Sequence, residues 1–220
     1  MRVHVVHGIL TPVGASGLLQ VVPYLRQAGF DVRVPDYGLV TAVETRIANP
    51  LIVRTLRPYV EPGDVYIGHS NGCAIGYELM TGGAGLAGAV FLNAALERTV
   101  TTPERTWLDV YYNTGDEATV AAIAAERLGL SDTVWGDMGH AGYLGSNPAV
   151  TNIDCGKRSS VESIKAGVED FPAVSGHSDI FTPEKFKYWG PYIVQRIKAH
   201  LGASAPLPII QKSCSIQPVR

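Results

Sequence analysis

A serine flanked by two glycines lies at the centre of the segment GDVYIGHSNGCAIGYELM, residues 63–80. The run before Ser70 predicts a strand and the run after it a helix, so the Gly-x-Ser-x-Gly sequence marks a strand-to-helix turn. Such a turn exposes the hydroxyl above the sheet edge and directs a helix N-terminus at it, which stabilises negative charge. Gly68 and Gly72 lack the Cβ atoms that would collide there. We therefore expect a nucleophile; the alternative is a serine that only caps the helix.

A reactive serine needs a base, and the base needs an acid that orients it. Asp116 follows the predicted strand LDVYYNT and opens a helix, while His177 lies in the polar segment AVSGHSDIF before the last predicted helix. We expect His177 to take the serine proton and Asp116 to orient the imidazole ring. The alternative for Asp116 is a simple helix N-cap, with Asp154 as the reserve acid. Asp179 is too close to His177 in sequence to be the first choice.

The segment GDMGHAGY contains a competing histidine, His140, with Asp137 close to it in sequence. His140 precedes the last predicted strand instead of following it, so its position favours substrate binding over proton transfer. Tyr143 in the same segment and Leu10 after the first strand are the other candidate substrate-binding residues.

The remaining histidines are expected to be structural. We expect His69 to point away from the serine's side of its strand, and His7 to brace the loop after the first strand. His4 and His200 have the character of ordinary sheet and helix residues.

The first strand, in VHVVHGIL, ends in His-Gly and a short loop. A tetrahedral oxyanion is stabilised by converging backbone N–H groups. We expect these donors to be the N–H of Ile9 in this loop and the N–H of Asn71, the residue after the serine.

The elements that position these residues alternate along the chain between β-branched runs and helical patterns. This order predicts an α/β fold with a doubly wound, mostly parallel sheet and helices on both faces. The strands are expected at 2–8, 31–37, 64–70, 88–94, 108–114 and 149–155, and most are apolar almost throughout, which indicates burial on both faces of the sheet. The helices are expected at 16–29, at 41–60 with an interruption at Pro50, at 71–83, at 116–129, and at 182–201 with Thr182 as N-cap and Pro183 in first position.

Two segments do not fit this alternation. Residues 131–148 are Gly-rich with scattered aromatic side chains and predict a long surface loop, a kind of element that often binds ligands. Residues 203–220 are rich in Pro and Ser and predict a tail that wraps the surface or is mobile. The expected organisation is a single domain over residues 1–202 followed by this tail.

Composition excludes several other classes of protein. The 220 residues include 18 Lys and Arg against 20 Asp and Glu, a net charge of -2 that gives no electrostatic basis for binding nucleic acid. No apolar run is long enough for a spanning segment. The three cysteines have no metal-ligand spacing, so buried thiols are expected, with one bridge left open. The N-terminus carries no export signal, so a cytoplasmic protein is expected, with a secreted mature form or release by lysis left open.

Four motifs in order, HGIL, GHSNG, NTGDEATV and GHSDIF, resemble the α/β-hydrolase superfamily, and most closely its minimal, lidless lipases and esterases. The segment VVPYLRQAGFDVRVPDYG is similar to the first helix and next strand of that family. Two features differ from the family pattern. The chain starts at the His-Gly strand without the two strands that precede it in larger members, and no cap domain fits between its strands.

The resemblance implies a serine hydrolase that cleaves carboxylic esters through an acyl-enzyme, without metal or organic cofactor. The expected substrate is a small-molecule or lipid ester, because few charges lie near the motifs. The same residues would serve a thioesterase, an amidase or an acyltransferase. A ligand-binding module without catalysis is the alternative of a different class.

Overall fold

The computed structural model describes residues 1–9, 13–38, 45–118, 135–156 and 171–202. Within these ranges the strands form one six-stranded sheet of order β2-β1-β3-β4-β5-β6, in which all neighbouring strands are parallel. The strands are β1 (Arg2–Val6), β2 (Asp31–Arg33), β3 (Val65–His69), β4 (Gly88–Leu92), β5 (Trp107–Tyr112) and β6 (Val150–Asp154). The predicted doubly wound sheet is confirmed, with a strand at each of the expected positions.

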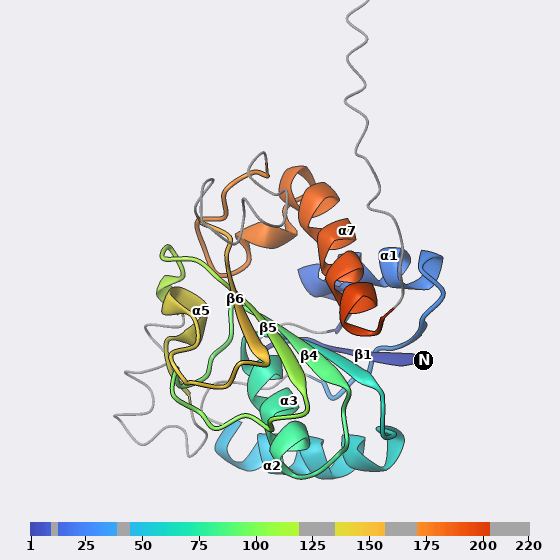
Figure 1. Ribbon diagram of the computed structural model, residues 1–220. Coiled ribbons are helices and arrows are strands. Elements are labelled where there is room, and N and C mark those ends of the chain that lie inside the picture. Colours follow the sequence, from blue (N-terminus) through green and yellow to red (C-terminus); the bar gives the residue numbers. More distant parts are fainter. Residues whose placement is uncertain (10–12, 39–44, 119–134, 157–170, 203–220) are drawn as a thin grey trace, which may run out of the picture.

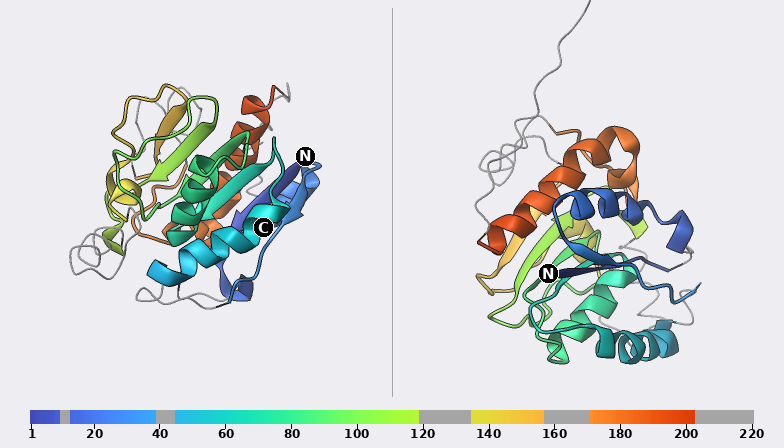
Figure 2. Two further views of the ribbon diagram at one scale, coloured as in Figure 1. Left: turned by 90° about the horizontal axis from the view of Figure 1, so that it is seen from below. Right: turned by 90° about the vertical axis from the view of Figure 1, so that its right-hand side faces the viewer.

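Helices cover both faces of this sheet (Figure 1). One face carries α1 (Val21–Gln27) and the long helix α7 (Pro183–His200), while α2 (Thr45–Leu56) and α3 (Asn71–Thr81) lie on the other. A single-turn helix, α5 (Met138–Ala141), packs beside β5. Two further views show the sheet enclosed between these layers (Figure 2).

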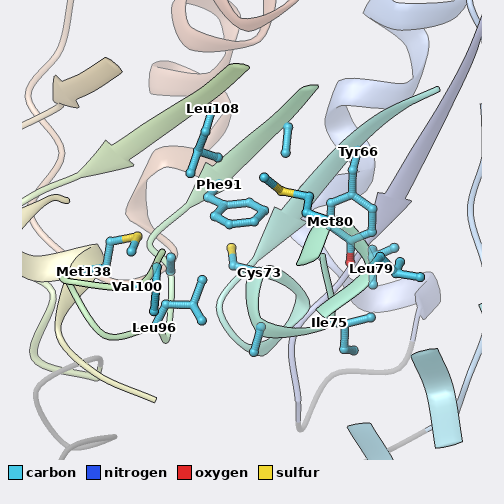
Figure 3. Packing of buried hydrophobic residues seen from close by; sticks show 14 of the residues in the cluster. Tyr66, Cys73, Ile75, Leu79, Met80, Phe91, Leu96, Val100, Leu108 and Met138 are labelled. Carbon is cyan, nitrogen blue, oxygen red and sulfur yellow. The ribbon is translucent and has the colours of Figure 1, made fainter. Parts of the chain in front are cut away.

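Each face of the sheet has its own buried apolar cluster. Ile67 of β3 belongs to the same buried cluster as Ile193 of α7, and the preceding residue, Tyr66, packs with Phe91 on the α3 side (Figure 3). Successive residues of β3 therefore point to opposite faces, and both are fully buried. This double coverage explains why the strands are apolar almost throughout.

The first two strands end before their predicted limits at the carboxyl edge of the sheet. β1 ends at Val6 and β2 at Arg33, instead of at residues 8 and 37. As an edge strand, β2 pairs with β1 over a short register that ends at His4 and Arg33. The residues beyond it leave the hydrogen-bond ladder and enter the loops that surround Ser70.

The helices differ from prediction at two places. α2 continues through Pro50, where an interruption was expected. Pro50 lies in the middle of the helix and is exposed, and its missing N–H removes one hydrogen bond of the helix without ending it. The segment 131–148 is not a loop throughout, because α5 begins after Asp137 as N-cap and ends at Gly142, which has φ 75°.

Other predicted features agree with the structure or lie outside it. α7 begins with Thr182 as N-cap and Pro183 in the first turn, as expected. The predicted helix at 116–129 lies mostly outside the described residues, as do residues 131–134 and the tail 203–220. The domain boundary at residue 202 therefore stays a prediction.

Two of the three cysteines can be placed. Cys73 and Cys155 are buried free thiols and belong to different apolar clusters, so they do not pair with each other. Cys214 lies outside the described ranges. None of the helices in the described part of the chain has the length and apolar character needed to cross a bilayer.

Candidate active site

Ser70 forms the turn between β3 and α3 with φ 55° and ψ −126°. A positive φ is uncommon for a residue other than glycine, and such strain clusters at functional sites. A Cβ added to Gly72 would lie 2.4 Å from the carbonyl oxygen of Val6, and one added to Gly68 would lie 2.8 Å from that of Gly72. The two glycines are therefore required by the close approach of α3 to the backbone of β1 and β3.

The loop after β1 packs directly against Ser70. A Cβ added to Gly8 would lie 2.9 Å from Cβ and 3.4 Å from Oγ of the serine. Tyr37 holds this loop, because its hydroxyl donates to the carbonyl oxygen of His7 and its ring stacks on the imidazole at 4.2 Å. Nδ1 of His7 lies 2.7 Å from the carbonyl oxygen of Gly8, and burial lowers the pKa of His7. His7 is therefore a neutral brace of the loop.

Both candidate oxyanion donors belong to segments that contact Ser70. Ile9 follows Gly8 in this loop and lines the cavity at the serine. Asn71 is the first residue of α3, so its N–H has no acceptor within the helix. Backbone N–H groups at a helix start are suited to stabilise developing negative charge.

The imidazole of His177 and the carboxylate of Asp116 are in direct contact. Nδ1 lies 2.8 Å from Oδ1 of a fully buried Asp116. Because a carboxylate only accepts, Nδ1 carries the hydrogen, and Nε2 of the neutral ring is left able to take a proton. Asn93 donates its amide to the other carboxylate oxygen, Oδ2, at 2.8 Å. Asn93 has φ 48°, and among the described non-glycine residues only Ser70, with φ 55°, also has a positive φ.

The loop that carries the histidine packs on the turn that carries the acid. The amide of Asn113 donates to the carbonyl oxygen of Gly176 at 3.2 Å. A Cβ added to Gly115 would lie 2.9 Å from the backbone of Ser175, so the two segments touch through main-chain atoms. Asp179 accepts from the N–H of Ser175 at 2.7 Å and thus holds the loop itself.

His69 faces the same cavity as Ser70, which corrects the expectation that it points away. Side chains alternate along β3 only as far as His69, because Ser70 has a positive φ and leaves the strand. Nε2 of His69 donates to the carbonyl oxygen of His177 at 3.0 Å, and the two rings lie 4.7 Å apart. Burial, and to a smaller extent the nearby His177, lower the pKa of His69 to about 3. This neutral ring connects the serine strand to the histidine loop.

A cavity of about 310 Å³ opens beside the serine. It is lined by Gly8, Ile9, Ala15, Ser16, Gly17, His69, Ser70, His177, Ser178, Phe181 and Thr182. Phe181 forms its main apolar wall and makes an edge contact with His69 at 4.9 Å. A Cβ added to Gly17 would lie 2.7 Å from Cβ of Phe181, so these two cavity-lining residues are in close contact.

The structure does not bring the other substrate-binding candidates to this cavity. Tyr143 lines a separate hollow of about 580 Å³, formed with residues of the segments 99–104 and 145–148. His140 lies in α5 and is not among the described residues that line the cavity at Ser70. The segment is held at the end of β5 by a hydrogen bond from the N–H of Asn113 to the carbonyl oxygen of Gly139. Leu10 falls outside the described residues.

Three asparagines near the site were missed by sequence reasoning. Asn93 and Asn113 follow directly after apolar strands, and a polar residue at the carboxyl end of a buried parallel strand is a signal that could have identified both. Asn49 of α2 forms hydrogen bonds with the side chain of Asn71. It carries no comparable signal, because most polar residues of a surface helix face solvent.

The chemistry available to this arrangement is proton transfer and nucleophilic attack. It combines a hydroxyl on a strained backbone turn, an imidazole in contact with a buried carboxylate, and backbone N–H groups at a helix start. In the described part of the chain, no group of three or more His, Cys, Asp or Glu side chains is arranged to hold a metal ion.

Comparison with solved structures identifies the fold. Alpha/beta hydrolase domain-containing protein 10 from mouse superposes with a TM-score of 0.55 at 10% identity, over 90% of this chain and 90% of that one. The monoacylglycerol lipase of Paleococcus ferrophilus gives 0.54 at 13% identity, over 90% of this chain and 94% of its own. A hydrolase of the alpha/beta superfamily from Xanthomonas campestris pv. campestris gives 0.53 at 10% identity, over 90% and 98%.

No protein-family model and no curated protein matches the sequence. The likeness to solved structures, at identities of 10 to 13%, concerns the fold. The chain has the α/β-hydrolase fold, as its four motifs indicate.

Proposed function

We propose that the protein is a serine hydrolase that cleaves carboxylic esters. The observation that carries this proposal is the environment of Ser70: its strained turn opens into the cavity that His177 also lines, and the imidazole contacts the buried Asp116 at 2.8 Å. A strained backbone lowers the stability of a fold and is typical of functional sites. Its occurrence at a serine beside a cavity and an oriented imidazole supports a catalytic role.

In the proposed reaction, Oγ of Ser70 attacks the ester carbonyl while Nε2 of His177 takes the hydroxyl proton. Asp116 stabilises the imidazolium that forms. The N–H groups of Ile9 and Asn71 hold the oxyanion, a contact typically worth about 3 kcal/mol per donor. His177 then protonates the departing alcohol, and water, activated by the same ring, hydrolyses the acyl-enzyme and regenerates the serine.

Two considerations indicate the class of bond that is cleaved and the size of the acyl group. An alkoxide leaves a tetrahedral intermediate more easily than an amide nitrogen, so an ester is favoured over an amide. The cavity volume of about 310 Å³ is at the small end of ligand sites, which span about 300 to 1,000 Å³, and this favours a small acyl group.

A fluorophosphonate probe tests the nucleophile and the base together, because the serine oxygen displaces fluoride from phosphorus as it would displace an alcohol. We expect wild type to be labelled and Ser70→Ala to remain unlabelled. His177→Ala should label at least about 100-fold more slowly, the usual contribution of a general base. His140→Ala is the matched control and should retain most of the wild-type rate. Labelling is followed by intact mass.

Three results would contradict the proposal. Correctly folded wild type that resists the probe and does not hydrolyse p-nitrophenyl acetate would indicate a binding protein without catalysis. Loss of labelling in His140→Ala with labelling kept in His177→Ala would reverse the assignment of the base. Faster release from a p-nitroanilide than from the matching ester would replace the esterase by an amidase.

A further inference from the structure

The side chain of Asn71 is held in a buried hydrogen-bonded cluster behind the serine. Its Nδ2 donates to Oδ1 of Asn49 at 2.9 Å, and its Oδ1 accepts from Nδ2 of Asn49 at 2.9 Å. The same Oδ1 accepts from Nε1 of Trp135 at 3.0 Å. All three hydrogen bonds are therefore made by the side-chain amide of Asn71.

This cluster joins three separate parts of the fold. Asn71 begins α3, Asn49 belongs to α2, and Trp135 precedes α5. Asn49 and Asn71 are 0% exposed and Trp135 is 3% exposed, so water does not compete for these hydrogen bonds. A buried amide that loses its partner costs about 1–3 kcal/mol, so the arrangement of the three residues is strongly determined.

The cluster holds the side chain of Asn71, whose backbone N–H is a candidate oxyanion donor. Asn71 follows the strained Ser70, and it lies in the first turn of α3, where backbone hydrogen bonds hold only the carbonyl side. The N–H of Asn71 therefore needs another constraint on its direction. Two amide hydrogen bonds and one indole hydrogen bond on its own side chain supply that constraint.

We propose that Asn49 and Trp135 are positioning residues that fix the N–H of Asn71 toward the oxyanion. This proposal rests on the proposed function, because it requires that N–H to stabilise a transition state. Neither residue touches the substrate or the reacting atoms. Their effect is transmitted through the side chain of Asn71, which is anchored to α2 and to the segment before α5.

A merely structural role predicts something different. If the cluster only stabilises the packing of α2 on α3, its removal lowers stability without changing the balance between substrate and transition-state binding. If it positions the donor, removal lowers kcat while KM stays constant, because the ester carbonyl in the ground state needs the donor less than the oxyanion does.

The experiment compares Asn49→Leu, which removes both amide contacts, and Trp135→Phe, which removes one N–H, with the control Thr106→Val. The hydroxyl of Thr106 donates to Leu86 in a buried position before β5, at the opposite edge of the sheet. Wild type is first shown to label with fluorophosphonate. Each variant is then assayed for kcat and KM on p-nitrophenyl acetate and for inhibition by phenylboronic acid. In the boronate adduct the serine oxygen bonds to boron, its proton passes to His177, and a boron-bound oxygen occupies the oxyanion position.

We expect Asn49→Leu to lose about tenfold or more in kcat, part of the 100- to 1,000-fold typical for loss of a whole donor, with a matching loss of boronate affinity and constant KM. Trp135→Phe should follow the same pattern to a smaller extent. If Asn49→Leu does not fold, the kcat, KM and boronate affinity of Trp135→Phe test the proposal. The inference is overturned if the folded variants match Thr106→Val in kcat and boronate affinity, or if their losses appear in KM alone. Unlabelled wild type refutes the proposed function instead.

Discussion

Two histidines from distant parts of the chain meet beside Ser70, and their surroundings give them different capacities. His177 contacts a buried carboxylate, which stabilises the positive charge that a base acquires. His69 is buried without such a partner for its ring, and burial lowers its pKa to about 3. A group with that pKa is too weak a base near neutral pH, so the residue next to the serine positions the histidine loop and does not take the proton.

The depressed pKa of His69 predicts how stability depends on pH. Its folded value of about 3 lies below the ordinary 6.5, so the unfolded chain binds more protons between these values. His69 therefore does not reduce the free energy of unfolding above about pH 6.5. Below that pH the free energy of unfolding falls, by at most about 1.4 kcal/mol per pH unit from this residue. Glutamine retains an N–H donor but does not titrate. The free energy of unfolding of His69→Gln should therefore fall less steeply than that of wild type as the pH is lowered.

Urea unfolding at a series of pH values between about 4 and 7 measures this difference. His7, whose pKa is also lowered by burial, contributes to the slope of both proteins and cancels in the comparison. Parallel stability curves for wild type and His69→Gln would show that His69 titrates normally in the folded state.

At the scale of elements, the site depends on the contact between α3 and the carboxyl end of β1. Gly72 is the point of contact, and the carbonyl oxygens of Val6 and His7 occupy the space where a Cβ would be. These are backbone atoms at the end of β1 and in the residue that follows it, so they cannot move aside as a flexible side chain could. The turn at Ser70 exists because two glycines allow the helix to start so close to the sheet.

Gly72→Ala should therefore destabilise the protein by about 1–3 kcal/mol, the usual cost of overpacking, or prevent folding. Gly14→Ala is the matched control, because Gly14 has no atom within 4 Å of an added Cβ and its φ is not positive. We expect the control to unfold at the wild-type temperature and to label normally with fluorophosphonate. Equal unfolding temperatures for the two variants would mean that the elbow tolerates a wider separation of helix and strand.

At the scale of the whole molecule, the parallel topology gathers the polar residues at one edge. β1, β3, β4 and β5 are neighbours in the sheet, and their carboxyl ends lead to Gly8, Ser70, Asn93 and Asp116. His177 comes from beyond β6 and reaches this edge because its loop packs on the turn of the acid. Gly8, Ser70 and His177 line one cavity, which Phe181 bounds on one side.

The size of that cavity predicts the acyl preference of the proposed esterase. With about 310 Å³ available, p-nitrophenyl acetate and butyrate should be hydrolysed with higher kcat/KM than the decanoate below its solubility limit. Phe181→Ala removes the apolar wall and should raise the decanoate-to-acetate ratio. A wild-type preference for decanoate would mean that the acyl chain binds outside this cavity.

Much of the fold could be predicted because its signals are local. Most of the six strands are apolar runs bounded by turn residues, and the order of serine, acid and histidine motifs agrees with a parallel sheet. The contact of His177 with Asp116 was proposed from that order alone. The direction of His69 was predicted wrongly, because period-two alternation does not extend past a residue with positive φ.

The amino-acid order by itself determined the sheet, the glycine-flanked turn and the candidate residues, since periodicity, glycine and chain order are properties of neighbouring positions. Only the tertiary structure decided that Tyr143 and His140 do not line the cavity at Ser70 and that the side chains of Asn49 and Trp135 meet at Asn71. Such contacts join segments distant in the chain. They arise from how helices pack on the sheet, which no local pattern specifies.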